Sequence, residues 1–167
     1  MSVVAWRIIQ RKFATLAFTG KGARLFGGRW NSPGHAVVYT AQSLALAALE
    51  ILVHVDSDKL LQNYVAIPVI IGPQLITQVE ESELPNNWRA YPASNAPRSI
   101  GDAWISRAIL PVLRAPSAVI PAEYNFLLNP SHKDFEKLRI GKPQRFRFEP
   151  SDRQTVDSAG IARGLAH

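Results

Sequence analysis

The stretch Gly27-Gly28-Arg29-Trp30-Asn31-Ser32-Pro33-Gly34 has the composition of a ligand-binding loop. Its paired glycines allow the backbone to approach a ligand closely or to adopt a positive φ. Arg29 carries a planar guanidinium whose donors match the geometry of a phosphate or a carboxylate. A short β-prone run follows at residues 37–40 and contains Tyr39. We therefore interpret this part of the chain as an anion-holding loop next to a short strand.

A helical segment is predicted at residues 42–55, where the sequence is apolar on almost every side. A helix of this kind is usually buried, and Ser43 is a suitable N-cap for it. Glu50 is the one carboxylate in this segment. A buried carboxylate is costly unless a cation or a ligand meets it, and Arg29 is the expected partner.

The remaining elements alternate between strands and helices without a regular βαβ order, which predicts an α+β fold. We expect strands at residues 2–9, 64–71, 75–80, 117–120 and 144–149, a helix at 99–112 and a helical turn at 135–138. Pro68 indicates an edge or a bulge in the strand at 64–71. We expect a long connection at 11–31, a loop at 84–97, and an ordered segment at 125–130 that ends in a turn.

Length and composition indicate one globular domain. The chain has 167 residues, of which 47% are hydrophobic and 19% charged, as in ordinary folded domains. The absence of cysteine excludes disulfides and thiolate zinc sites. The N-terminus lacks a signal-peptide pattern, and no apolar run reaches the roughly 18 residues of a membrane span, so we expect a cytoplasmic protein without membrane contact. We expect a single domain over residues 1–150 and a tail over residues 151–167.

Positive charge is concentrated in the first third of the chain. The net charge is +6, and no acidic residue precedes Glu50. Six cationic residues do precede it: Arg7, Arg11, Lys12, Lys21, Arg24 and Arg29. This distribution suits an anionic ligand such as a nucleotide, although it also fits a basic surface face or a nucleic-acid site. The spacings of zinc fingers, basic heptads and RNA-recognition strands are absent.

The polar residues of this region favour cleavage of a glycosidic bond. The chain has no G-x-S-x-G elbow, no phosphate-binding P-loop and no H-E-x-x-H motif. Glu50 and His54 share a helix face, but two ligands without a third make a weak metal site. A fixed carboxylate can stabilise an oxocarbenium-like sugar. In NAD the nicotinamide ring already carries a positive charge and leaves as a neutral molecule, so no general acid is needed. In this hypothesis Arg29 holds phosphate, Tyr39 contacts the ribose and Glu50 steadies the charge.

Each of these residues also has an ordinary structural interpretation. Tyr39 can be a core aromatic side chain, Arg29 a member of a surface ion pair, and Glu50 the buried partner of some other cation. The residue chemistry alone leaves both interpretations open.

Several motifs in register resemble the RES domain, a family named for an Arg, a Glu and a Ser. They are Gly22-Ala23-Arg24-Leu25-Phe26-Gly27-Gly28-Arg29-Trp30-Asn31-Ser32-Pro33-Gly34, Val38-Tyr39-Thr40-Ala41, residues 46–54, Gly101-Asp102-Ala103-Trp104, residues 116–121 and residues 123–132. The resemblance runs from about Trp6 to His132. The naming residues fall on Arg29, Glu50 and Ser117.

The resemblance implies the toxin of a bacterial type II toxin–antitoxin pair. Its fold is expected to be ADP-ribosyltransferase-like, with a mixed sheet core and flanking helices. The partner is expected to be an Xre-like helix-turn-helix antitoxin whose chain end occludes the site, and the toxin to form a homodimer within the complex without binding DNA directly. NAD is the implied substrate; no cofactor or metal is expected.

The resemblance also assigns the site. Arg29, Tyr39 and Glu50 are the implied catalytic residues. The substrate-binding residues we expect are Arg7, Arg24, Gly28, Ser117 and Asn125. The reaction is expected to be hydrolysis or phosphorolysis of the nicotinamide–ribose bond. One alternative is transfer of ADP-ribose to a host protein, and a more remote one is a nucleic-acid binder or RNase that uses the basic N-terminal third.

Overall fold

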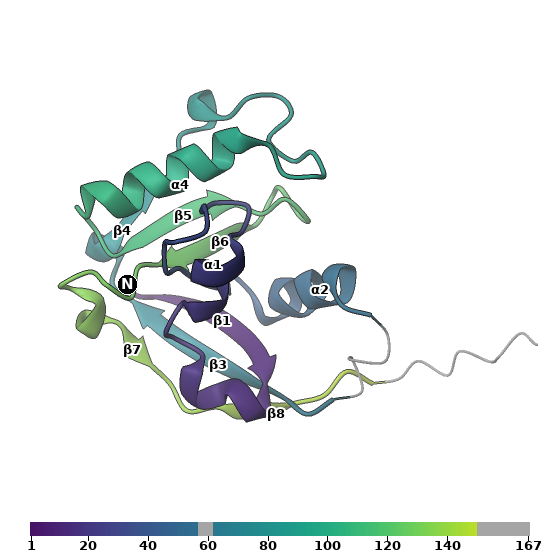
Figure 1. Ribbon diagram of the computed structural model, residues 1–167. Coiled ribbons are helices and arrows are strands. Elements are labelled where there is room, and N and C mark those ends of the chain that lie inside the picture. The colour runs from purple at the N-terminus through teal and green to yellow at the C-terminus, as the bar shows by residue number, and fades with distance from the viewer. Residues whose placement is uncertain (57–61, 150–167) are drawn as a thin grey trace, which may run out of the picture.

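The computed structural model describes residues 1–56 and 62–149 and shows one mixed sheet with helices around it (Figure 1). The strands are β1 (Val3–Gln10), β2 (Val38–Ala41), β3 (Tyr64–Ile71), β4 (Ile76–Gln78), β5 (Val112–Pro116), β6 (Tyr124–Leu128), β7 (Arg139–Ile140) and β8 (Gln144–Phe146). The α-helices are α1 (Lys21–Phe26), α2 (Leu44–His54) and α4 (Asn95–Arg107). Short 3-10 helices are η1 (Arg11–Leu16), η2 (Pro73–Leu75), η3 (Glu81–Glu83) and η4 (Phe135–Lys137).

The sheet has the strand order β4-β5-β6-β2-β1-β3-β7, and β8 also pairs with β3. The pairs are antiparallel except for the parallel pair β4–β5. In Figure 1, α1 lies between two groups of strands. On one side of it are β4, β5 and β6, and on the other are β1, β3 and β7. Helix α4 lies beyond β5. The α+β prediction is therefore confirmed.

Both faces of the central strands are covered by apolar side chains. Leu127 and Leu128 are neighbours on β6 and both are fully buried. Because successive strand residues point to opposite faces, they enter different clusters. Leu128 packs in a cluster with residues of β1, β3 and β5, whereas Leu127 packs in a cluster with Trp30 and the α4 residue Trp104. The loop that carries Arg29 is thus anchored to the core through Trp30.

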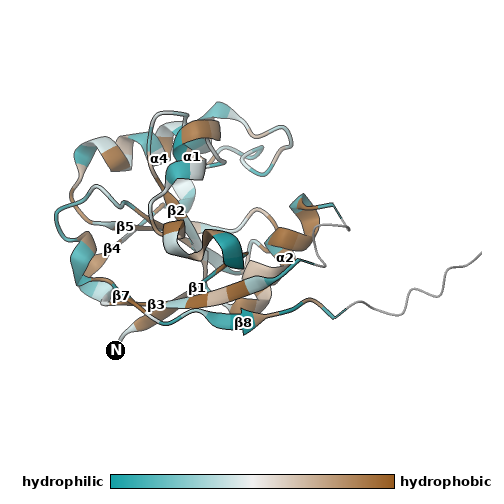
Figure 2. Ribbon diagram, turned by 60° about the horizontal axis from the view of Figure 1, so that its bottom comes forward, coloured by the Kyte–Doolittle hydropathy of each residue, from teal (hydrophilic) through white to brown (hydrophobic). Residues whose placement is uncertain are grey.

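Helix α2 confirms one part of its prediction and corrects another. It covers Leu44–His54, and Ser43 Oγ accepts a hydrogen bond from Leu46 N at 3.0 Å, so Ser43 is the N-cap. The prediction of burial all round is wrong, because Leu52 and Val53 are about half exposed. In Figure 2 the ribbon of α2 is brown, the colour of hydrophobic residues, along most of its length. Helix α2 therefore has more apolar side chains than it buries in the core.

Three sequence predictions place elements incorrectly. The connection at 11–31 contains η1 and α1, and the helix expected at 99–112 begins earlier and ends at Arg107. The strand expected at 117–120 is wrong, since β5 precedes it and Ser117 Oγ accepts hydrogen bonds from the amides of Val119 and Ile120. A hydroxyl that serves two nearby amides folds the backbone into a turn.

The strand at 144–149 is shorter than expected, because β8 ends at Phe146. The other strand predictions and the helical turn at 135–138 are confirmed within a few residues. Pro68 lies in β3 between the residues that pair with β7 and those that pair with β8, and its carbonyl accepts from Gly141 N at 2.7 Å. The proline therefore sits at a break in the outer pairing, where a missing amide is tolerated. The tail predicted at 151–167 lies outside the described residues.

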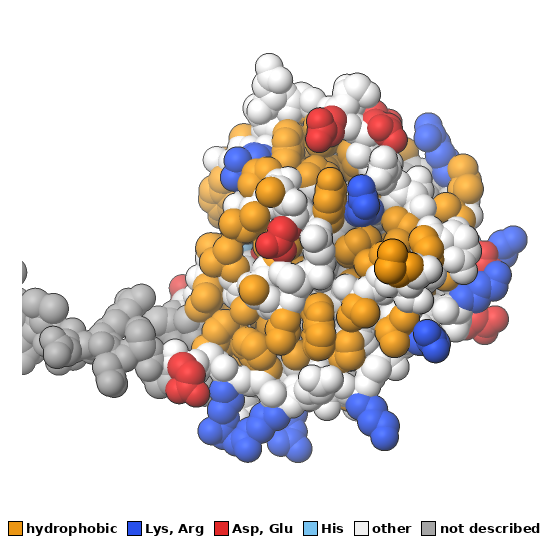
Figure 3. Space-filling view, turned by 180° about the vertical axis from the view of Figure 1, so that it is seen from behind, with side chains coloured by type: hydrophobic (Ala, Val, Ile, Leu, Met, Phe, Trp, Pro, Cys, Tyr) orange, Lys and Arg blue, Asp and Glu red, His pale blue; other side chains and the backbone are white. Residues whose placement is uncertain are grey.

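On the face seen in Figure 3, apolar side chains fill much of the middle, and most Lys and Arg side chains lie near the margins. The described part of this face has no continuous basic stripe. Within the described residues, no helix is both long and apolar enough to cross a bilayer.

Candidate active site

The glycine-rich loop is shaped by a close approach to Tyr39. Gly27 has φ +70°, and the amide of Gly28 donates to Asn31 O at 2.9 Å, which closes a tight turn around Arg29. A Cβ at Gly28 would lie 2.5 Å from the Tyr39 hydroxyl. Gly28 therefore allows the loop to pack closely onto β2, an approach to a protein side chain, whereas the sequence predicted an approach to a ligand or a positive φ.

Tyr39 fixes the loop from the sheet side. Its hydroxyl donates to Asn31 Oδ1 at 2.7 Å and accepts from Trp30 N at 3.1 Å. Burial raises the pKa of Tyr39, so the phenol stays protonated and keeps its donor role. The ring also lines the pocket described below, which leaves it available to a ligand.

Glu50 projects from α2 and is held by two neutral donors. Asn125 Nδ2 donates to Glu50 Oε1 at 2.8 Å, and Ser117 Oγ donates to the same oxygen at 3.1 Å. Burial raises the pKa of Glu50, while these two hydrogen bonds act in the opposite direction. The expected Arg29–Glu50 ion pair is absent from the described structure. The carboxylate is instead oriented by an amide and a hydroxyl, and within the described residues it makes no ion pair with an arginine.

Arg29 and Arg89 bring two guanidinium groups to the same pocket. Arg29 Nη1 donates to the carbonyls of Trp88 and Ala90 at 2.9 and 3.2 Å, and Arg89 Nε donates to Ala118 O at 3.0 Å. Burial, and then the charge of Arg89, lower the pKa of Arg29. Within residues 1–56 and 62–149 neither guanidinium makes an ion pair with a carboxylate. Two adjacent unpaired cations form a site for an anion.

These groups meet in a cavity of about 530 Å³. Its lining comprises Ala23, Gly27, Gly28, Arg29, Trp30, Tyr39, Glu50, His54, Arg89, Tyr91, Ala118, Val119 and Asn125. The three predicted catalytic residues thus lie together with two of the predicted binding residues. Sequence reasoning missed Arg89 and Tyr91, which come from the connection before α4.

The other three predicted binding residues lie outside this lining. Ser117 reaches the cavity through Glu50, and Arg24 is exposed on α1. Arg7 lines a neighbouring cavity of about 490 Å³ and donates from Nη1 to Tyr39 O at 2.9 Å. Its Nε is buried without a hydrogen-bond partner, and burial lowers the pKa of Arg7 to about 10. Arg7 therefore supports β2 behind Tyr39.

The donor set offers little to a metal ion. No group of three or more His, Asp or Glu side chains with suitable placement occurs within residues 1–56 and 62–149. The pair Glu50 and His54 has no third ligand there, and two protein ligands fall short of a typical transition-metal site.

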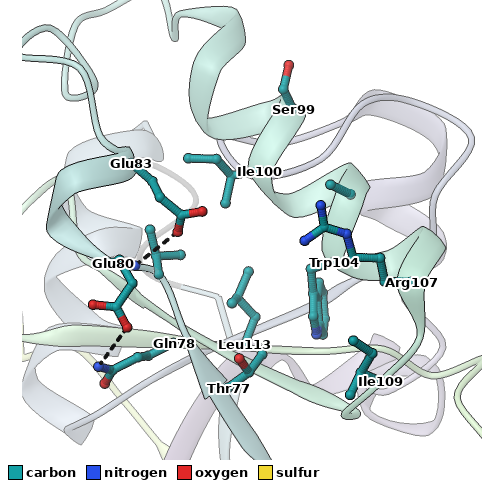
Figure 4. A pocket seen from close by; sticks show the side chains of 12 residues that line it. Thr77, Gln78, Glu80, Glu83, Ser99, Ile100, Trp104, Arg107, Ile109 and Leu113 are labelled. Atoms are coloured by element: carbon teal, nitrogen blue, oxygen red, sulfur yellow. Dashed lines mark hydrogen bonds between the residues drawn. The ribbon is translucent and has the colours of Figure 1, made fainter.

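A third cavity, of about 540 Å³, lies between α4 and β4 and shares no lining residue with the Arg29 cavity. Figure 4 shows Trp104, Arg107 and Ile109 around it, together with Glu80, whose carboxylate accepts from Gln78 and whose amide donates to Glu83. Its two carboxylates therefore serve the local turn at η3, and it holds no pair of cations comparable to Arg29 and Arg89.

Removing a donor to Glu50 is expected to raise its pKa further. Both hydrogen bonds go to Glu50 Oε1 and favour the ionised form. Ser117→Ala should therefore move the titration of the Glu50 carboxyl to higher pH, as followed by carbon NMR of side-chain-labelled glutamate. Ser99→Ala, an exposed serine on α4, is the control. An unchanged or lowered pKa in Ser117→Ala would contradict the assigned role of the hydroxyl.

The curled mixed sheet and its pocket define an ADP-ribosyltransferase-like α+β fold. The structure resembles a chain of the crystal structure of the Mycobacterium tuberculosis MbcT–MbcA toxin–antitoxin complex, with a TM-score of 0.71 at 18% identity, covering 88% of this chain and 85% of that chain. The profile of the RES domain family matches residues 4–149. The chain belongs to the RES domain family.

Curated relatives cover nearly the same length. A protein named Toxin Res from Yersinia enterocolitica is 37% identical over 149 residues, which are 89% of this chain and 98% of the relative. A protein named Prs ADP-ribosylating toxin from Sphingobium sp. is 34% identical over 155 residues, which are 90% of this chain and 96% of the relative.

Proposed function

We propose that this RES protein is the toxin of a bacterial type II toxin–antitoxin system and that it acts in the cytoplasm by cleaving the nicotinamide–ribose bond of NAD. Depletion of NAD would then arrest growth. The observation that carries the proposal is the Glu50 carboxylate, which the neutral donors Asn125 and Ser117 hold in the same cavity as Arg29 and Arg89.

The chemistry follows from the charges in this cavity. The bond between ribose C1′ and the pyridinium nitrogen breaks, and its electron pair neutralises the nicotinamide as it leaves. Positive charge then develops at C1′, where the Glu50 carboxylate stabilises it. Water or inorganic phosphate completes the reaction at C1′ and, in the case of water, loses a proton to solvent. No acid is required because the leaving group departs neutral.

In this proposal Arg29 and Arg89 bind the diphosphate of NAD. A dinucleotide carries a diphosphate, and a guanidinium binds phosphate oxygens through paired, charge-assisted hydrogen bonds. Arg29, Arg89 and Glu50 all line the same cavity, and the charge of Arg89 acts on Arg29. A volume of about 530 Å³ is in the range of small-molecule sites.

A second candidate function is transfer of ADP-ribose to a host protein. The relative from Sphingobium sp. bears the name of an ADP-ribosylating toxin, and the same pocket would serve that reaction with a protein side chain as acceptor. A more remote alternative is a nucleic-acid binder or RNase that uses the basic N-terminal third, although the described part of the face seen in Figure 3 has no continuous basic stripe.

The acceptor can be determined by supplying each candidate separately. The purified chain is incubated with NAD labelled in its adenine ring in phosphate-free buffer, in phosphate buffer, and with a bacterial extract depleted of nucleotides. We expect free ADP-ribose in the first and its phosphate ester in the second or, if water is the only acceptor, ADP-ribose in both. Label found only on proteins of the extract would overturn hydrolysis and phosphorolysis and establish the transferase.

We further propose an Xre-like antitoxin as the partner, whose chain end occludes the cavity. Exposed apolar side chains surround the neighbouring cavity, which adjoins the active site through Ala23 and Tyr39. They are Phe13, Leu16, Leu25 and Phe26. Lys21 lines this cavity and Arg24 is exposed on the same helix, α1, so an apolar segment that ends in a carboxylate fits this surface.

Removing the contact at Phe26 is expected to free the toxin from its antitoxin. Phe26 is 82% exposed, so Phe26→Asp should fold and arrest growth when expressed alone, yet resist rescue by the co-expressed antitoxin. Growth curves and cellular NAD measure both effects. Val4→Asp, on the first strand, is an exposed apolar control outside this region. Full rescue of Phe26→Asp would contradict docking at this surface.

A further inference from the structure

We infer that α4 positions Arg29 for its ligand, with Arg98 and Asp102 as positioning residues and Gly101 as the point of contact. This inference rests on the proposed function, since it states how the anion-binding arginine of that site is held. Arg98, Gly101 and Asp102 lie outside the lining of the cavity, so they act through the loop.

Two hydrogen bonds from α4 bracket the loop. Asp102 Oδ1 accepts from Ser32 N at 2.9 Å, and Arg98 Nε donates to Gly28 O at 3.1 Å. Because Arg98 and Asp102 are four residues apart, they lie on one face of the helix. They therefore hold the loop on both sides of Arg29, Arg98 at Gly28 and Asp102 at Ser32.

Gly101 lies between these two side chains and lets the helix approach the loop. A Cβ built at Gly101 would fall 1.7 Å from Trp30 O, a separation that no side chain can occupy. A glycine inside a helix costs about 1 kcal/mol relative to alanine. The close contact with Trp30 is the physical reason for its presence in α4.

The loop is held on its other side by Tyr39. The Tyr39 hydroxyl bonds to Trp30 N and Asn31 Oδ1, while α4 bonds to Gly28 O and Ser32 N. The backbone that carries Arg29 is thus fixed between β2 and α4. The Arg29 side chain lines the cavity, and its guanidinium donates to the carbonyls of Trp88 and Ala90. Displacement of a substrate-positioning group by about 1 Å can cost roughly 100-fold in catalytic efficiency.

The α4 contacts are expected to control substrate binding more than the chemical step. Asp102→Ala removes the acceptor for Ser32 N, and Gly101→Ala displaces Trp30. Each should raise KM for NAD about 10-fold or more, with a much smaller change in kcat, because Glu50 is held by Asn125 and Ser117 and not by α4. Asp102→Asn keeps an oxygen acceptor and should retain most of the parent affinity.

Matched controls separate positioning from general damage. Gly22→Ala is a helical glycine substitution in open space, since nothing lies within 4 Å of its built Cβ. Arg107→Ala removes an arginine from the same helix at the cavity in Figure 4. Both should leave KM unchanged.

Amide hydrogen exchange provides a measurement that does not require NAD cleavage. Exchange at residues 28–32 should accelerate in Asp102→Ala and Gly101→Ala, but stay near the parent rate in Asp102→Asn and both controls. If the parent chain fails to cleave NAD, the proposed function fails, while this exchange pattern still supports the positioning role. The positioning role would be overturned if both variants kept the parent's exchange rate and KM. It would also be overturned if Asp102→Ala lowered kcat, substrate affinity and thermal stability together and Asp102→Asn restored none of them.

Discussion

Glu50→Gln is expected to lower the rate of NAD cleavage by about 100- to 1000-fold, the usual effect of removing a group that stabilises transition-state charge. Glutamine preserves the shape of the side chain and one oxygen for the donors Asn125 and Ser117. What it removes is the negative charge that opposes the developing charge at C1′. The loss should therefore appear in kcat, as measured by nicotinamide release, with little change in KM.

The fold of this variant should survive. Because the folded-state pKa of Glu50 is raised, its contribution to stability is present below the ordinary glutamate pKa and is lost as pH rises through the raised value. At neutral pH the ionised side chain is thus a cost that glutamine removes, and the melting temperature should not fall. Glu136→Gln is the matched control, since Glu136 is exposed on η4 and lies outside the lining of the cavity. Parent-like turnover in Glu50→Gln would rule out the electrostatic role.

Arg29→Lys is expected to weaken NAD binding by about 10- to 100-fold, the range for losing a hydrogen bond between charged groups. Lysine keeps the positive charge but lacks the planar fork that engages two phosphate oxygens at once. It also cannot hold the carbonyls of Trp88 and Ala90 in the same way. Titration calorimetry with ADP-ribose measures the effect without turnover.

Arg139→Lys, on the exposed strand β7, is the control for this substitution. It should bind ADP-ribose as the parent does. Parent-like binding by Arg29→Lys would show that charge alone matters at this position, and would shift the role of phosphate anchor to Arg89.

Sequence patterns predicted the central strands because their apolar and β-branched residues are continuous. They failed where a single side chain redirects the backbone. Val119 and Ile120 favour a strand by composition, yet the buried Ser117 hydroxyl serves both amides and forms a turn. Helix α4 starts before Pro97, which fits within its first turn, so that proline does not mark the end of the preceding loop.

The sequence singled out three residues that share a cavity, but it did not predict their contacts, and their roles in catalysis stay predictions. Arg29, Tyr39 and Glu50 were identified from chemistry and family resemblance, and they do share a cavity. The spacing of these residues along the chain does not show which of them are in contact. The ion pair between Arg29 and Glu50 was expected from their opposite charges alone, and it is absent from the described structure. Arg89 lies in a segment without periodicity, where nothing in the sequence separates a ligand-binding arginine from a surface one.

The most direct measurement is nicotinamide release by the purified chain from NAD alone, with no protein acceptor present, quantified by mass spectrometry over many turnovers. The account predicts that nicotinamide appears in equal molar amount to the NAD lost, and that Glu50→Gln abolishes nearly all of it. Intact NAD after prolonged incubation with the folded parent chain would contradict the account.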